Sequence, residues 1–301
     1  MQVYYAPENY ALELKKELAL KKVKILHDHA TLFVTDDVTD QTIYWKQDYG
    51  LDAQILHFNS VGDAVKLLKQ YKVKWTHWSL TNHRRAELIL SQINTPKAKI
   101  HDFPARADKT NYGCFSLVDQ NTMIVSAQLQ HPFPLGVVEF SATKEPPSRA
   151  YLKLWEFLSL SQASLSDIQN TLDVGSAPGG WTWVLADFSQ KVFSVDKADL
   201  DASILKNKKV KYLNQSAFAL KPEEIGPIDW FCSDIICYPD KLYQLVQNWM
   251  ASSLVKNFVC TIKFQGETDF EAIEKFAAIP GSSVQHLYHN KHELTWSLQQ
   301  K

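Results

Sequence analysis

The chain has 301 residues, of which 45% are hydrophobic and 22% charged, and its length predicts two domains or one large one. Its 9 Trp, 12 Tyr and 15 Phe supply enough core material to exclude a disordered chain. The net charge of −1 excludes a uniformly basic nucleic-acid binder but leaves room for a local basic patch. No apolar run reaches the roughly 20 residues that span a bilayer, and the first residues lack the pattern of a signal peptide. We therefore expect a cytoplasmic location.

The first part of the chain mixes short strands with amphipathic helices, up to a predicted boundary at residues 141–149. Two adjacent prolines there favour an extended segment, which separates domain 1–140 from domain 146–301. The apolar spacing predicts helices at 8–20, 61–71 and 82–93. Strands are predicted at 3–6, 23–26, 30–35, 42–45, 53–58, 73–77, 115–118 and 123–128. Short strands that are often adjacent predict an α+β domain with antiparallel pairing.

After the boundary, strands and helices alternate. Strands are predicted at 171–174, 191–195, 210–213, 228–232 and 258–262, and helices at 180–188, 241–254 and 269–278. This alternation is typical of a doubly wound parallel α/β sheet. Two further strands, 283–288 and 293–298, predict a closing hairpin that adds an antiparallel edge strand.

Cysteine and histidine patterns predict neither a metal site nor a disulfide framework. The four cysteines form no Cys-x-x-Cys pair, so we expect free, mostly buried thiols at Cys114, Cys232, Cys237 and Cys260. A group of three histidines near the end of the chain spans a predicted strand and turn rather than one ligand face: His286, His289 and His292. We therefore expect no bound metal.

A glycine-rich turn joins the strand at 171–174 to the helix at 180–188. Glycines there let the backbone approach a ligand closely, and the start of the helix offers N–H groups to a carboxylate. The next strand ends at Asp196, where an acid can accept two hydrogen bonds from a ribose diol. The pattern predicts a nucleotide-like ligand, although a plain tight turn with a surface carboxylate would also fit it. The turn is not Gly-x-Gly-x-x-Gly, which makes a dinucleotide the weaker choice.

The segment Gly-Ser-Ala-Pro-Gly-Gly-Trp-Thr at 175–182 resembles the first motif of S-adenosylmethionine-dependent methyltransferases, and in detail the FtsJ-type family of RNA 2′-O-ribose methyltransferases. The resemblance covers residues 146–301. It implies a Rossmann-like domain, S-adenosyl-L-methionine as cofactor and RNA, in particular rRNA, as partner. The cofactor-binding residues that it implies are Ser148, Gly175, Ala177, Pro178, Gly179, Gly180, Trp181, Asp196, Ser216 and Asp234. At Ser216 the family tends to have Asp, so this position departs from the pattern.

The resemblance also implies a catalytic set of Lys, Asp, Lys and Glu in chain order. Lys153 lies in Ser-Arg-Ala-Tyr-Leu-Lys-Leu, Asp234 follows the strand at 228–232, Lys263 lies in Lys-Phe-Gln-Gly, and Glu293 opens the last strand. Alone, each has an ordinary structural explanation, as a helix cap, a surface lysine or an exposed strand residue. Together they predict a general base at Lys263, oriented by Asp234, with Glu293 holding Lys153 or the ribose.

The resemblance is strongest to a branch of large-subunit rRNA cytidine 2′-O-methyltransferases, whose members carry an N-terminal RNA-binding region with a THUMP-like part. We therefore expect residues 1–140 to bind RNA. The candidate cations are Lys15, Lys16, Lys21, Lys22, Lys24, Arg84, Arg85, Arg106 and Lys109, and the candidate stacking rings are Trp45, Trp75 and Trp78. Two alternatives stay open: a catalytically inactive RNA-binding scaffold, and a methyltransferase that acts on a protein or a small molecule.

Overall fold

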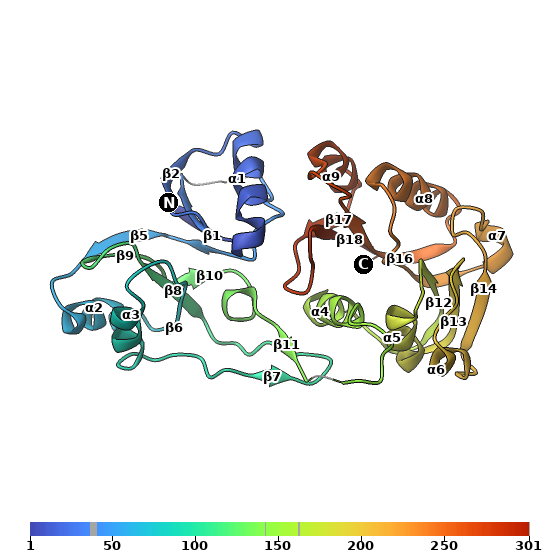
Figure 1. The fold of residues 1–301 in the computed structure, drawn as a ribbon, viewed down its shortest axis with the longest axis horizontal. Helices are drawn as coiled ribbons and strands as arrows, with labels where there is room; N and C mark the ends of the chain where they lie inside the picture. The colour runs from blue at the N-terminus through green and yellow to red at the C-terminus, as the bar shows by residue number, and fades with distance from the viewer. Residues whose placement is uncertain (37–40, 142, 162, 301) are drawn as a thin grey trace. The chain divides into compact units, whose positions relative to one another are not determined.

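The computed structural model describes residues 1–36, 41–141, 143–161 and 163–300, and it divides into two compact units (Figure 1). The N-terminal unit comprises residues 1–101 and 106–139, and the C-terminal unit comprises 102–105 and 140–301. Residue 142 of the predicted boundary lies outside the described residues.

The N-terminal unit contains a five-stranded antiparallel sheet in the order β10-β4-β1-β3-β2. Its strands are β1 (Gln2–Tyr5), β2 (Ile25–Asp28), β3 (Leu32–Thr35), β4 (Asp48–Leu51) and β10 (Gln128–Leu129). Between β1 and β2 lie a short 3-10 helix, η1 (Glu8–Tyr10), and α1 (Ala11–Leu20).

A second sheet of the same unit has the order β5-β9-β8-β6. Its elements are β5 (Gln54–His57), α2 (Val61–Leu68), β6 (Lys74–His77), α3 (His83–Leu90), β8 (Tyr112–Leu117) and β9 (Thr122–Ser126). Apolar side chains of both helices pack on the sheet around Leu68, Trp75, Ile89 and Phe115. The α+β class is confirmed, but β6 pairs with β8 in parallel. A crossover through α3 joins these two strands, and such a crossover returns the chain in the same direction.

The predicted strand at 42–45 is wrong, because this segment bonds to a side chain instead of a neighbouring strand. The backbone N–H groups of Tyr44 and Trp45 donate to the buried carboxylate of Glu17, at 2.8 and 2.9 Å. The prediction that Trp45 and Trp75 stack on RNA bases is also wrong, because both side chains are buried in the core. Trp78 is half-buried, and its indole N–H donates to Thr31 Oγ1 at 3.0 Å.

The C-terminal unit is built on a seven-stranded sheet in the order β14-β13-β12-β15-β16-β18-β17. Five strands run parallel, which confirms the doubly wound α/β prediction: β12 (Ile168–Val174), β13 (Ser189–Asp196), β14 (Val210–Asn214), β15 (Ile228–Ser233) and β16 (Val255–Lys263). The closing strands are β17 (Ser282–Gln285) and β18 (Glu293–Gln299). The antiparallel strand β18 lies between β16 and β17 rather than at the edge, because both of its backbone edges are paired.

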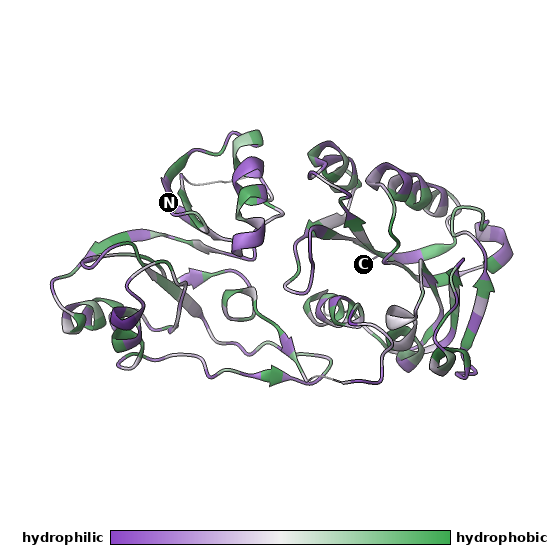
Figure 2. Cartoon of the chain, in the orientation of Figure 1, coloured by the Kyte–Doolittle hydropathy of each residue, from purple (hydrophilic) through white to green (hydrophobic). Residues whose placement is uncertain are grey.

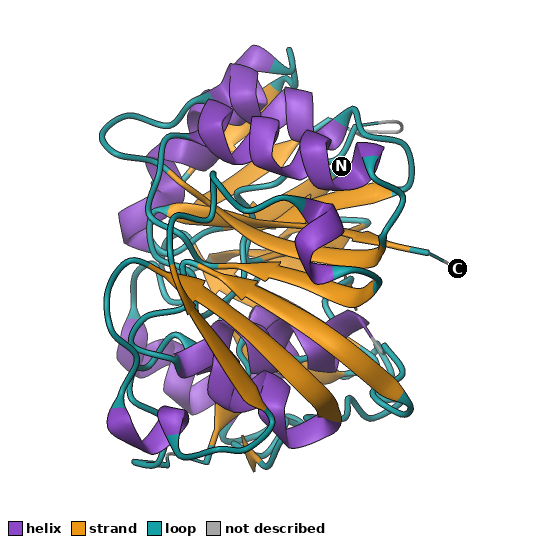
Figure 3. Cartoon of the chain, turned by 90° about the vertical axis from the view of Figure 1, so that its right-hand side faces the viewer, coloured by secondary structure: helices purple, strands orange, loops and turns teal. Residues whose placement is uncertain are grey.

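Helices lie on both sides of this sheet (Figure 3). They are α4 (Tyr151–Ser161), α5 (Gly180–Phe188), α6 (Ala202–Leu205), α7 (Pro222–Ile225), α8 (Pro239–Ala251) and α9 (Phe270–Ala277). Hydrophobic and hydrophilic residues alternate along α8 and α9 (Figure 2), as expected for helices with one face on a sheet. In the described part of the chain, no helix is both long and apolar enough to cross a bilayer. All four cysteines are free and buried, as predicted.

The remaining elements are short: β7 (Ile100–His101), η2 (Pro134–Gly136) and β11 (Glu139–Phe140).

Candidate active site

A pocket of about 370 Å³ lies at the carboxyl ends of β12, β15 and β16. The chain leaves β12 toward β13 on one side and later returns to β15 on the other, so this is the point where the strand order reverses. Open parallel sheets bind ligands at such a point. The pocket is lined by Ser148, Ala150, Asp173, Gly175, Ser176, Ala177, Pro178, Gly180, Trp181, Asp196, Asp234, Ile235, Ile236 and Lys263.

The glycine turn needs its glycines for two different reasons. Gly175 has a φ of +74°, and a Cβ there would lie 2.6 Å from the Cα of Ile235, so a side chain would collide with the opposite wall. Gly180, the first residue of α5, lies against Ser148, and a Cβ at this position would overlap the Ser148 hydroxyl. The two glycines therefore let the turn, which we call the glycine cradle, pack closely against Ile235 and Ser148 in the wall of the pocket.

Most of the predicted cofactor-binding residues line this pocket, but two do not. Gly179 has a φ of +118°, and a Cβ there would meet the side chain of Ile204 instead of the cavity. Ser216 is absent from the pocket lining, and its hydroxyl accepts the N–H of Phe218 at 3.3 Å. Ser176 and Asp173 also line the pocket but are not among the predicted cofactor-binding residues, although both lie within or directly before the glycine turn.

Two buried oxygens of this pocket have no hydrogen-bond partner among the described residues: Asp173 Oδ1 and Ser176 Oγ. The other carboxylate oxygen of Asp173 accepts the hydroxyl of Thr182 at 2.6 Å. Burial, aided by the charges of Asp234 and Asp196, raises the pKa of Asp173 to about 7 even though Thr182 opposes the shift. A buried acceptor that faces a cavity without a partner fits a ligand with a cationic donor, such as the ammonium of an amino acid.

Asp196, at the end of β13, is held in place by two backbone groups. Its Oδ2 accepts the N–H of Ala177 at 3.0 Å, and its Oδ1 accepts the N–H of Ala198 at 2.9 Å. Each carboxylate oxygen has a second lone pair available. The fixed carboxylate can therefore still accept hydrogen bonds from a ribose diol. The cradle, Asp173 and Asp196 together fit S-adenosylmethionine.

The structure brings the four predicted catalytic residues into one cluster. Lys153 Nζ lies 2.5 Å from Asp234 Oδ1 and 3.0 Å from Glu293 Oε1. Lys263 Nζ lies 3.1 Å from the same Asp234 oxygen and also donates to the Asp234 backbone carbonyl. The β16–β18 register places Glu293 directly opposite Lys263. Asp234 and Lys263 line the pocket, whereas Lys153 and Glu293 lie behind them.

The two lysines differ in how they are held. Burial lowers the pKa of Lys153, but the charges of Asp234 and Glu293 and the hydrogen bonds to them outweigh burial and raise it above the ordinary lysine value. Lys153 is therefore a permanent cation that links two carboxylates. Lys263 contacts one carboxylate and faces the cavity, so it is the lysine placed to meet a substrate.

Glu156, one turn after Lys153 on α4, fixes the turn that leads into Glu293. Its carboxylate oxygens accept the backbone N–H groups of Tyr288 and His289 at 2.7 and 2.9 Å. The side chain is buried, which raises the pKa of Glu156 to about 8 although both N–H donors oppose this. Because α4 carries both Lys153 and Glu156, the same helix contacts Glu293 and holds its turn.

We expect Glu156→Leu to lower kcat about tenfold and leave donor affinity unchanged, because two backbone N–H groups lose their carboxylate and the Glu293 turn loosens. Glu156→Gln keeps one acceptor and should have a smaller effect. Steady-state kinetics with calorimetric donor titrations measure both quantities. In a Glu156→Leu, Glu293→Gln double variant, kcat should be no lower than in Glu293→Gln. Full additivity of the two losses would show that Glu156 does not act through Glu293.

The predicted N-terminal lysine cluster is partly neutralised by acids. Lys15 pairs with Asp28 at 2.6 Å, and Lys21 lies 3.4 Å from the buried Glu17. The exposed members of the cluster include Lys16 and Lys22. Among the described residues, no group of three or more His, Cys, Asp or Glu side chains is arranged to hold a metal ion.

Comparison with known proteins finds methyltransferases that are similar to this chain. Residues 146–279 match FtsJ-like methyltransferases. The chain is 30% identical over 181 residues to Ribosomal RNA large subunit methyltransferase M of Laribacter hongkongensis, covering 54% of this chain and 51% of that protein. It is 28% identical over 183 residues to the protein of the same name from Methylococcus capsulatus, covering 56% and 51%. The chain thus spans about half the length of these curated relatives.

Proposed function

We propose that this chain, whose residues 146–279 belong to the FtsJ-like methyltransferase family, transfers a methyl group from S-adenosylmethionine to a ribose 2′-hydroxyl of RNA. One observation carries the proposal: Asp234 and Lys263 line the same pocket as the glycine cradle and Asp196. A base for the acceptor and a site for the donor therefore share one cavity. The names of the relatives support rRNA of the large ribosomal subunit as the substrate.

The donor supplies an activated methyl group, and the residues of this chain prepare the acceptor. A ribose hydroxyl is a poor nucleophile until its proton is removed, and Lys263 Nζ takes that proton when its amine is unprotonated. Asp234 holds Lys263 in place through Oδ1 and its backbone carbonyl. The Lys153 cation offsets one of the two negative charges of Asp234 and Glu293 and holds both carboxylates in place while the proton moves to Lys263.

This arrangement favours the enzyme over the two alternatives. An inactive scaffold has no need of a buried lysine held by two carboxylates beside a ligand pocket, because removing these charges from water is energetically unfavourable. A protein amine or thiol is often nucleophilic without a strong base, whereas a ribose hydroxyl requires one. The proposal includes RNA binding by residues 1–140 and a cytoplasmic location.

We expect Asp196→Ala to weaken donor binding by more than about 1 kcal/mol, because hydrogen bonds from the ribose diol to a charged acceptor are lost. Isothermal titration calorimetry with S-adenosylmethionine measures the change. Asp199→Ala, an exposed acid three residues further along, is the matched control. Equal donor affinity in Asp196→Ala and wild type would remove Asp196 from the donor site.

The function is tested by mapping 2′-O-methyl marks on rRNA from cells with and without the gene. A 2′-O-methyl group blocks alkaline cleavage of the adjacent phosphodiester, so each mark appears as a gap in the cleavage ladder. We expect a gap in the large-subunit rRNA that disappears with the gene and returns with wild type but not with Lys263→Ala. Unchanged ladders on all cellular RNAs would contradict the proposal.

A further inference from the structure

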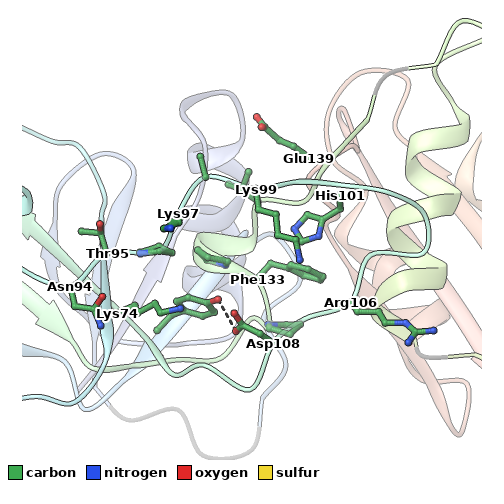
Figure 4. A pocket seen from close by; sticks show the side chains of 16 residues that line it. Lys74, Asn94, Thr95, Lys97, Lys99, His101, Arg106, Asp108, Phe133 and Glu139 are labelled. Carbon is green, nitrogen blue, oxygen red and sulfur yellow. Dashed lines mark hydrogen bonds between the residues drawn. The ribbon is translucent and has the colours of Figure 1, made fainter.

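The N-terminal unit contains a second and larger pocket, of about 810 Å³ (Figure 4). Its walls come from three stretches of chain, 94–101, 106–112 and 132–139, together with Lys74 at the start of β6. All of its lining residues belong to the N-terminal unit. The pocket is therefore separate from the methyl-transfer site and needs its own explanation.

The rim of this pocket is basic although the chain as a whole carries a net charge of −1. Four of its lining residues are cations, Lys74, Lys97, Lys99 and Arg106, against two acids, Asp108 and Glu139. Lys97, Lys99 and Arg106 are exposed, so their charges face solvent. A concave surface lined by one sign of charge concentrates ligands of the opposite sign.

One of the two acids is already engaged within the pocket wall. Asp108 Oδ1 accepts the hydroxyl of Tyr112 at 2.9 Å and the N–H of Thr110 at 3.0 Å, and Figure 4 shows the first of these bonds. A hydrogen bond from the Thr110 side chain, followed by those from the Thr110 backbone and Tyr112, lowers the pKa of Asp108 and keeps it ionised. These bonds hold the wall together, and the lining has two more basic than acidic side chains.

The floor of the pocket is aromatic. Phe133 and Tyr112 are buried, and the ring of His101 meets the ring of Phe133 edge-on with centroids 5.1 Å apart. Burial, and then the charge of Lys99, lowers the pKa of His101, so its ring is neutral at pH 7. A neutral imidazole offers one donor and one acceptor, which suits the edge of a base.

We propose that this pocket binds a single-stranded segment of the RNA substrate, with phosphates on the Lys97, Lys99 and Arg106 rim and a base against the half-buried ring of His101. A duplex presents its phosphates on a convex surface and keeps its bases stacked, so it cannot fill a concave pocket. A basic rim above an aromatic floor is the arrangement that binds unpaired nucleotides. The inference rests on the proposed function and extends it to the N-terminal unit.

The test compares two triple variants of the full chain. The first, Lys97→Ala, Lys99→Ala, Arg106→Ala, removes the exposed rim cations. The matched control, Lys66→Ala, Lys69→Ala, Lys72→Ala, removes three exposed cations elsewhere on the same unit. The probes are a fluorescein-labelled single-stranded RNA of mixed sequence and the corresponding duplex. Fluorescence anisotropy across a salt series gives the affinity and its salt dependence for each protein.

We expect the rim variant to bind the single strand at least tenfold more weakly. The slope of log affinity against log salt should fall by about 2, because each lost phosphate contact on a single strand removes about 0.7. The control variant should stay within twofold of wild type, and binding of the duplex should change less than binding of the single strand. Calorimetry should show equal affinity for S-adenosylmethionine in all three proteins, which verifies that the C-terminal site is intact.

Unchanged affinity and slope in the rim variant would overturn the inference and leave the proposed function standing, provided that wild type still methylates ribose. A larger loss in the control variant would assign RNA binding to the surface around Lys66, Lys69 and Lys72 instead. Equal losses for duplex and single strand would overturn the single-stranded assignment. If the rim variant loses RNA affinity as expected but wild type adds no methyl group to ribose, the pocket inference holds and the proposed function fails.

Discussion

Lys263→Ala is expected to lower the rate of methyl transfer by about 10²–10⁴-fold, the range that a positioned general base contributes. Lys263 is the lysine of the cluster that lines the pocket, and its side chain is held by Asp234 rather than enclosed by two acids. Its loss leaves the glycine cradle and Asp196 untouched. We therefore expect S-adenosylmethionine to bind Lys263→Ala as it binds wild type.

Single-turnover kinetics with labelled donor measure the chemical step directly. The matched control is Lys241→Ala, an exposed lysine at the start of α8, which should react at the wild-type rate. A Lys263→Ala protein that binds donor normally and transfers the methyl group at the wild-type rate would refute the role of base.

Lys153→Met should destabilise the fold by about 3–5 kcal/mol, the loss expected when one partner of a buried ion pair is removed. Lys153 is buried and bridges Asp234 and Glu293, so its replacement leaves two carboxylates beside each other without the cation between them. Urea denaturation followed by circular dichroism measures the free energy of unfolding.

A double variant separates charge from packing in this cluster. Lys153→Met, Glu293→Gln removes one of the two carboxylate charges and should be more stable than Lys153→Met alone. If both variants lose the same free energy of unfolding, the destabilisation comes from packing of the lysine stem. A Lys153→Met protein as stable as wild type would show that the ion pairs do not support the fold.

Local patterns predicted the parts of the fold that local forces decide. The helix predicted at 180–188 is α5 with the same bounds, because the glycine turn fixes its first residue. The parallel strands β12 to β16 follow from apolar runs that alternate with helices, a pattern that a buried parallel sheet requires. The cluster of Lys153, Asp234, Lys263 and Glu293 was accessible through the family resemblance, since each residue lies in a recognisable short motif.

Contacts between distant parts of the chain account for the features that the sequence did not reveal. The segment at 42–45 has the composition of a strand, but its N–H groups bond to Glu17, which lies on α1. Glu156 reads as an ordinary helix residue, and its two partners follow 132 and 133 positions later. The rim of the N-terminal pocket joins Lys99 and Arg106 with the 132–139 stretch, and no motif links these segments.

Identifying the methylated product made by the purified full chain tests the proposed function most directly. Large-subunit rRNA transcribed without modifications is incubated with S-adenosylmethionine, digested to nucleosides and analysed by mass spectrometry, with wild type and Lys263→Ala in parallel. We expect a 2′-O-methylated nucleoside with wild type and its loss, by about 10²-fold or more, with Lys263→Ala. A product methylated on the base, or equal ribose methylation by both proteins, would contradict the proposed function.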